Sequence, residues 1–167
     1  MDKKSNTTIH EDDFTACIPD TASSLITDIG DKLHNSSDFK SRTFENGISI
    51  IYIDTLIDTL NLNQDILPNI IEPGIVPENI PDKILVGNVK NFTTIDDAVK
   101  AIISGNVLIY YEGFSSVWAA EIKTSNGRAL TKPENESQVL GAQLAFTESM
   151  VTNVSIIRRY LSTPDLC

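Results

Sequence analysis

Two sets of side chains in this sequence have the residue types that catalysis or metal binding requires. Asp54 and Asp58 are four residues apart, a spacing that places two carboxylates on one helix face for acid–base work or a divalent cation. Such a cation needs more oxygen ligands than this stretch supplies, so capping and solvated roles are favoured. A nucleophilic pair of Cys17 with His10 or His34 would join a polar tail to a helix end, without preorganised geometry. We therefore expect no catalytic residue, no metal and no cofactor.

Aromatic side chains gather in one predicted hairpin and suggest a different kind of site. They are Tyr110, Tyr111, Phe114 and Trp118. Such a cluster can line a pocket for a small ligand, but a hairpin that packs on a core gives the same pattern. Packing on the core is the favoured interpretation, and the ligand pocket is kept as the alternative.

Charged residues flank a long apolar pattern near the end of the chain. Glu134 and Glu136 lie at its start and Arg158 and Arg159 near its end, where each sign of charge favours a helix dipole. This account leaves Asn153 and a face of small or polar residues unexplained. That face comprises Gly141, Ala145, Glu148, Thr152, Ser155 and Arg159. It leaves room for a second packing surface, against another chain or within this one.

The pattern itself predicts a helix over residues 133–161. Apolar residues recur at three- and four-residue steps through Val139, Ala142, Phe146, Met150, Val154, Ile157 and Leu161. A helix of this length would reach ~40 Å, about the width of a small domain. Its apolar stripe is therefore expected to cover a sheet formed by the preceding chain.

Composition narrows the class of protein. The 167 residues are 41% hydrophobic, enough for one core, and carry 23 acidic against 13 basic residues, a net charge of -10. Nucleic acid and anionic membranes are poor partners for so acidic a chain. Two cysteines give no disulfide framework and favour a reducing compartment. No run of ~18 apolar residues occurs, so these residues are not expected to span a membrane, and no signal peptide is recognised.

The elements expected along the chain alternate between helices and hairpins. Residues 1–18 are expected to be a disordered acidic tail and residues 19–167 one α/β subdomain. The expected helices cover residues 20–35, 54–71 with an interruption near Asn61 and Pro68, 95–103 between a Thr94 cap and Gly105, and 133–161. The expected strands cover residues 38–44, 48–53, 107–111 and 117–123, with an edge strand or extended segment at 84–89. We predict a mixed sheet of four to five strands with helices packed on it, ordered as two helix-hairpin-helix halves.

Four stretches give the chain a family resemblance. They are NSSDFKSRTF at 35–44, IIYIDTLIDTLNLNQDILPNI at 50–70, AIISGNVLIYYEGF at 101–114 and PENESQVLGAQLAFTESMVTNVSIIRRYL at 133–161. In these stretches the chain resembles the A-subunit family of GerA-type spore germination receptors. The last stretch carries the family's residues in order: Pro133, Glu134, Glu136, Gly141, Phe146, Glu148, Asn153, Arg158 and Arg159.

The resemblance implies a non-catalytic soluble domain of a nutrient germinant receptor, acting in receptor assembly or signal coupling. The implied partners are the B and C subunits and other A subunits, at the cytoplasmic face of the spore inner membrane. The family's second subdomain and membrane segments are expected to be absent from these 167 residues. The implied interaction residues are Glu134, Glu136, Gly141, Ala145, Phe146, Glu148, Asn153, Arg158 and Arg159. The alternative is a domain that senses a nutrient directly, at the pocket of Tyr110, Tyr111, Phe114 and Trp118.

Overall fold

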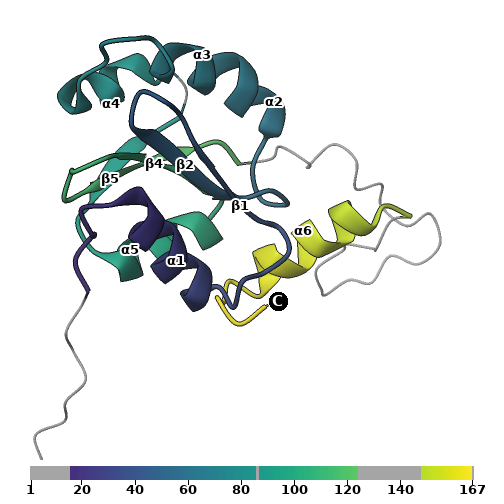
Figure 1. The fold of residues 1–167 in the computed structure, drawn as a ribbon. Helices are drawn as coiled ribbons and strands as arrows, with labels where there is room; N and C mark the ends of the chain where they lie inside the picture. Colours follow the sequence, from purple (N-terminus) through teal and green to yellow (C-terminus); the bar gives the residue numbers. More distant parts are fainter. Residues whose placement is uncertain (1–15, 86, 124–147, 167) are drawn as a thin grey trace, which may run out of the picture.

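A five-stranded sheet lies at the centre of the fold in the computed structural model, which describes residues 16–85, 87–123 and 148–166 (Figure 1). Its strands are β1 (Phe39–Thr43), β2 (Ile48–Ile53), β3 (Val89–Phe92), β4 (Asn106–Tyr111) and β5 (Val117–Glu121), in the spatial order β1-β2-β4-β5-β3. The predicted α/β fold and strand number are confirmed. The prediction of a mixed sheet is wrong, because all four strand pairings are antiparallel. This includes the pairing of β2 with β4, where the two hairpins meet.

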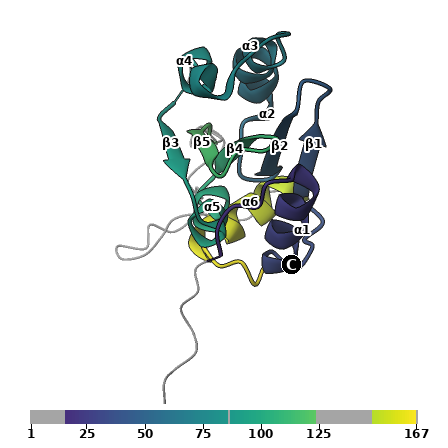
Figure 2. The same ribbon diagram turned by 60° about the vertical axis from the view of Figure 1, so that its left-hand side comes forward.

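Helices cover both faces of the sheet, and the residues of β2 show why its sequence is almost entirely apolar. Ile48 and Ile50 face one helical layer, whereas Ile51 and Ile53 face the other. Side chains alternate across a strand, so a strand buried on both sides needs apolar residues at nearly every position. The result is three layers, with the sheet between two sets of helices (Figure 2).

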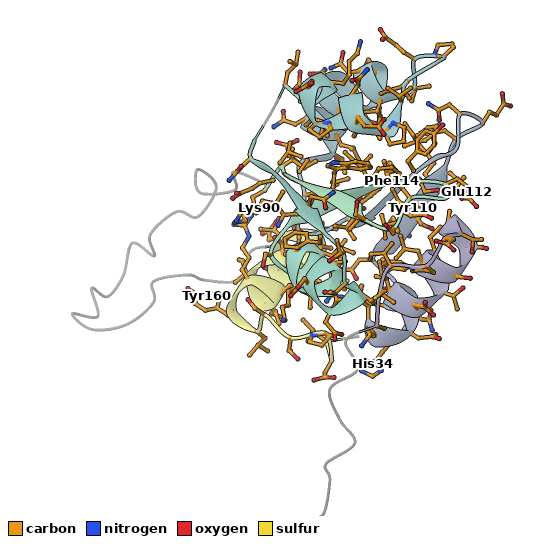
Figure 3. The ribbon with its side chains drawn as sticks, turned by 90° about the vertical axis from the view of Figure 1, so that its left-hand side faces the viewer. His34, Lys90, Tyr110, Glu112, Phe114 and Tyr160 are labelled. Atoms are coloured by element: carbon orange, nitrogen blue, oxygen red, sulfur yellow. The ribbon has the colours of Figure 1, made fainter. Side chains whose placement is uncertain are left out.

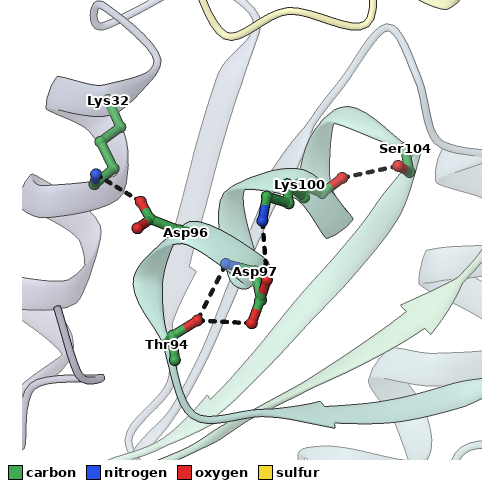
Figure 4. Close-up of polar contacts among 6 residues, drawn as sticks. All are labelled: Lys32, Thr94, Asp96, Asp97, Lys100 and Ser104. Carbon is green, nitrogen blue, oxygen red and sulfur yellow. Dashed lines mark hydrogen bonds and ion pairs between the residues drawn. The ribbon is translucent and has the colours of Figure 1, made fainter. Parts of the chain in front are cut away.

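One layer consists of α1 (Ala22–Lys32) and α5 (Ile95–Ile103). Both helices have threonine caps: Thr21 Oγ1 accepts from the Ser24 amide, and Thr94 Oγ1, the cap that the sequence predicts, accepts from the Asp97 amide. Gly105 ends α5 with φ +82°, in the left-handed region that favours glycine. An ion pair of 2.7 Å between Lys32 Nζ and Asp96 Oδ1 joins the two helices (Figure 4).

The other layer contains the interrupted helix predicted for residues 54–71. It comprises α2 (Thr59–Asn61), a π-helical segment (Leu62–Ile66) and α3 (Leu67–Ile70). Pro68 has no N–H to donate within the helix, which explains why the regular pattern changes here. A 3₁₀ turn (Pro77–Asn79) and α4 (Ile80–Lys83) follow, in a stretch for which the sequence predicts no helix.

The boundaries differ from the predictions at two further places. The edge strand expected at 84–89 is displaced, because β3 covers Val89–Phe92 and pairs with β5. This strand lies between the two predicted halves, whose helix-hairpin-helix order is not confirmed. The expected tail extends too far: Cys17 forms a bridge with Thr94, and Ile18 is buried and donates its N–H to the Thr93 carbonyl at 3.1 Å. Residues 1–15 lie outside the described part of the chain.

The last helix is the largest departure from the sequence analysis. α6 covers Met150–Tyr160, and Ser149 before it is extended and acts as the N-cap. A single helix over residues 133–161 is therefore wrong, while residues 133–147 lie outside the described part. α6 lies beside the turn that joins α1 to β1, and none of its residues belongs to either apolar core cluster (Figure 1). It does not cover the sheet. Among the described residues, no helix is long and apolar enough to cross a membrane.

Candidate interaction surface

α6 attaches to the rest of the fold through polar side chains. Its two buried residues are Ser155 and Arg158, three positions apart and hence on one side of the helix. The guanidinium of Arg158 donates from Nε to Asp38 Oδ2 at 2.7 Å and from Nη2 to Asp38 Oδ1 at 2.6 Å. Nη2 also donates to Ser36 Oγ at 2.6 Å. We refer to the bidentate contact as the Arg158–Asp38 ion pair.

Asp38 is the centre of this polar cluster. Besides Arg158, its carboxylate accepts from Ser36 Oγ at 2.7 Å and from Thr55 Oγ1 at 2.6 Å. Burial alone raises the pKa of Asp38, but the hydrogen bonds from Arg158, Thr55 and Ser36, together with the Arg158 charge, hold that pKa below its ordinary value. The carboxylate is therefore charged at neutral pH, and it joins three segments: the turn before β1, the turn after β2, and α6.

A second side of α6 carries apolar residues that the core does not cover. We define the α6 apolar stripe as Met150, Val154, Ile157 and Leu161, which recur at helical spacing. Val154 and Ile157 are half-buried, whereas Met150 is 80% and Leu161 54% exposed. A groove of about 320 Å³ runs beside the stripe, between α6 and the turns at Ser36–Asp38 and Thr55.

Two further apolar side chains of α6 are exposed on other sides of the helix. Val151, beside Met150 at the start of α6, is 64% exposed. Tyr160, at the opposite end, is 56% exposed and projects away from the helix (Figure 3). A helix that turns polar groups inward and leaves large apolar groups in water is suited to contact with another surface.

The residues implied by the family resemblance are only partly described. Glu148 and Arg159 are exposed, Asn153 is half-buried, and Arg158 is buried in the ion pair with Asp38. Arg158 is therefore bonded to the turn before β1 of this chain, and its role in an interface stays a prediction. Glu134, Glu136, Gly141, Ala145 and Phe146 lie outside the described residues.

The four aromatic residues of the predicted pocket are divided between the faces of the sheet. Tyr110 is fully buried against α1 and α5, and its hydroxyl donates to the Pro19 carbonyl at 3.0 Å. Trp118 is buried on the other face and stacks on Phe114 with ring centroids 5.3 Å apart. Tyr111 packs on that second face as well. The four side chains therefore do not line one pocket, and Tyr110 belongs to the core (Figure 3).

The other candidate groups have local structural roles. Asp58 caps α2 by accepting from the amides of Leu60 at 3.0 Å and Asn61 at 3.2 Å. His34 Nε2 contacts Asp165 Oδ1 at 3.1 Å. Within residues 16–85, 87–123 and 148–166, no three His, Cys, Asp or Glu side chains are grouped to hold a metal ion.

Sequence reasoning missed Asp38, Ser36 and Thr55 as the anchor of α6. The stretch at 35–44 contains Ser36 and Asp38, the stretch at 50–70 contains Thr55, and the last stretch contains Arg158. The sequence does not show that these stretches contact one another. Arg158 and Asp38 are 120 residues apart, and only the tertiary fold brings Arg158 to the turn before β1.

All of these stretches lie within the region that matches one protein family model. The model described as "Bacillus/Clostridium GerA spore germination protein" matches residues 27–167. The chain belongs to the GerA family. The match includes every residue of the polar cluster at Asp38, so the attachment of α6 lies within the family region.

Two GerA relatives that match most of this chain are considerably longer than it is. Spore germination protein GerQA of Bacillus cereus is 29% identical over 154 residues, which are 89% of this chain and 31% of GerQA. Spore germination protein KA of Bacillus subtilis (strain 168) is 26% identical over 125 residues, 71% of this chain and 23% of that protein. The chain thus spans less than a third of the length of these relatives.

One solved structure has a similar fold. It is the N-terminal domain of the A subunit of the Bacillus megaterium spore germinant receptor GerK3, with a TM-score of 0.66 and 24% identity. The similarity covers 92% of this chain and 60% of that one. The chain therefore shares the α/β fold of that domain.

Proposed function

We propose that this chain is a non-catalytic interaction domain of a germinant receptor A subunit and acts in receptor assembly or signal coupling during spore germination. The observation that carries the proposal is the orientation of α6. Its buried residues are polar, while Met150 and Leu161 of the α6 apolar stripe are exposed. Large exposed apolar side chains gathered beside a groove are typical of surfaces that bind another protein.

Family membership supplies the biological context. Because the relatives are spore germination proteins, we infer that the partners are the B and C subunits of the receptor and other A subunits. The corresponding location is the cytoplasmic face of the spore inner membrane. The net charge of -10 suits a protein partner better than nucleic acid or an anionic lipid surface.

Substitution of Met150 by aspartate tests this function. Met150 is the first residue of α6, where a negative charge favours the helix dipole, so Met150→Asp is expected to leave the fold intact. In spores, the variant should reduce co-purification of the other receptor subunits by about five- to thirtyfold, as for a contact worth about 1–2 kcal/mol. Gly141→Leu and Ala145→Leu are expected to act in the same direction.

Leu85→Asp is the matched control. Leu85 is 79% exposed, almost the same as Met150, but lies between α4 and β3. It should leave co-purification unchanged. Normal receptor assembly with Met150→Asp would contradict the proposed interface.

Direct nutrient sensing is the alternative function. Tyr111, Phe114 and Trp118 lie on one face, and the Phe114–Trp118 stack would report a ligand bound there. Titration of Trp118 fluorescence with amino acids and sugars tests this directly. The interaction proposal predicts no saturable change, whereas a saturable change with one nutrient would favour sensing.

A further inference from the structure

We infer that α6 is a releasable element of the fold, held in its docked position by the Arg158–Asp38 ion pair, and that Arg158 is a positioning residue for the α6 apolar stripe. The release itself follows from contacts within this chain. Its importance for receptor assembly rests on the function proposed above.

The core does not depend on α6. The two apolar clusters that fill the layers on either side of the sheet are built from α1 to α5, the strands and their connections. Neither contains a described residue of α6. If α6 moved away, both clusters would remain buried, so the rest of the fold is expected to persist without it.

The acceptor for Arg158 is organised from the core side. The Asp38 carbonyl accepts from the Asp54 amide at 2.9 Å, and the Phe39 amide donates to the Ser36 carbonyl at 3.0 Å. Thr55 and Ser36 also donate to the Asp38 carboxylate. These bonds hold the carboxylate in place whether or not Arg158 is present. Docking of α6 therefore resembles insertion of one guanidinium into a preformed site.

The Arg158–Asp38 ion pair fixes the orientation of α6 but contributes only a small net free energy to its docking. The Arg158 and Asp38 side chains are only 6% and 12% exposed, so both lose most of their hydration on docking. The attraction in such a buried pair is largely offset by that loss. A core made of apolar contacts has no such compensating cost, so α6 should open before the core does.

Ser155 lowers the stability of the docked state further. Its hydroxyl is buried and, among the described residues, has no hydrogen-bond partner. A buried hydroxyl without a partner costs free energy that water recovers when the group is exposed. Undocking of α6 would hydrate Ser155, so this residue favours release.

The contacts beyond α6 add little restraint. His34 and Asp165 connect the segment after α6 to the end of α1, but the two side chains are 53% and 77% exposed. Exposed pairs of this kind contribute little to stability and are screened by salt. Of the two ion pairs, the Arg158–Asp38 ion pair is by far the more buried and is therefore the stronger restraint on α6.

Amide hydrogen exchange of the 167-residue chain tests the inference. In the wild type, amides of α6 should exchange faster than the slowest amides of α5 and β4. Asp38→Asn and Arg158→Met should each accelerate exchange in α6 by at least about tenfold, because each leaves one buried partner uncompensated. The double variant should be no faster than the more affected single variant, since both remove the same contact. The amides of α5 and β4 should stay protected throughout.

Two further variants separate this contact from general effects on the helix. Tyr160→Met changes a side chain two residues further along, at an exposed position, and should leave exchange in α6 close to wild type. Ser155→Ala removes the buried hydroxyl and should slow exchange in α6 several-fold, opposite in sign to Asp38→Asn.

The outcomes distinguish this inference from the proposed function. If α6, α5 and β4 exchange at one common rate and accelerate together, α6 is part of a single cooperative unit and the inference is wrong. Unchanged α6 exchange in Asp38→Asn would also overturn it. Either result leaves the Met150→Asp test of receptor assembly unaffected, and failure of that test leaves the release of α6 unaffected.

Discussion

Asp38 shows how one side chain connects segments that are far apart in the sequence. It follows α1, precedes β1, and accepts hydrogen bonds from Thr55 and from Arg158, which lies 120 residues away. A lowered pKa is the expected property of a carboxylate with several donors and a neighbouring guanidinium. The stability contribution of this cluster should therefore depend on pH in a defined direction.

We predict that Asp38→Asn lowers the free energy of unfolding by about 1–3 kcal/mol at pH 7, because hydrogen bonds to a charged group are lost. Because the folded pKa of Asp38 is lowered, its contribution is complete above the unfolded pKa of about 4 and is lost as pH falls through the folded value. Urea denaturation of both proteins from pH 7 to pH 3 measures this. The difference between the two proteins should shrink as the pH falls below about 4, and a difference that stays constant with pH would contradict the account.

The sequence predicts the structural role of a residue when its partners are near it in the chain. Thr94 and Gly105 were recognised because cap and closing residue lie on the helix they delimit. Asp38 was not, since its partner is brought to it only by the tertiary fold. The prediction of one aromatic pocket is wrong for a related reason. In the pairing of β4 with β5, Trp118 lies opposite Ile109, one residue before Tyr110, so Tyr110 and Trp118 point to opposite faces of the sheet.

At the scale of elements, the connection into β3 depends on a glycine. Gly87 has φ +70°, and a methyl group added there would collide with the backbone carbonyl of Glu121 at the end of β5. The close approach lets the Glu121 amide donate to the Asn88 carbonyl at 3.2 Å, just before β3 pairs with β5. Only a residue without a side chain fits this position.

Gly87→Ala is therefore expected to destabilise the fold more than a glycine substitution at an open turn. Gly74 has a similar φ of +81° but no atom near the added methyl group, so Gly74→Ala should cost only about 1–2 kcal/mol for the left-handed backbone. Gly87→Ala should cost about 1–3 kcal/mol more, because backbone cannot yield as a side chain does. Thermal unfolding of both variants measures the difference, and equal melting temperatures would exclude the close approach.

The helices and strands with strong local signals were predicted, and those defined by tertiary contacts were not. α1, α5 and both hairpins have apolar periodicity and clear turn residues. β3 reads VKNF and is half exposed, so neither alternation nor a continuous apolar run indicates it. For α6, the stripe is present in the sequence, but periodicity alone does not say whether a core or a partner covers it.

At the scale of the whole molecule, the fold is a three-layer domain with a helix attached to its side. α1 and α5 pack on one face of the sheet and α2 to α4 on the other, so the sheet needs no further cover (Figure 2). The apolar residues of α6 are therefore surplus to the core. Because the GerA relatives of this chain are much longer than it is, we propose that a contact with another protein segment accounts for them.

A photo-cross-linking residue in place of Met150 tests that contact most directly. With the substituted chain in spores, irradiation should join position 150 to another subunit of the germinant receptor. The same residue in place of Leu85, which is equally exposed, should give no such product. No cross-linked receptor subunit from position 150, or equal products from both positions, would contradict the proposal that α6 is an interaction surface.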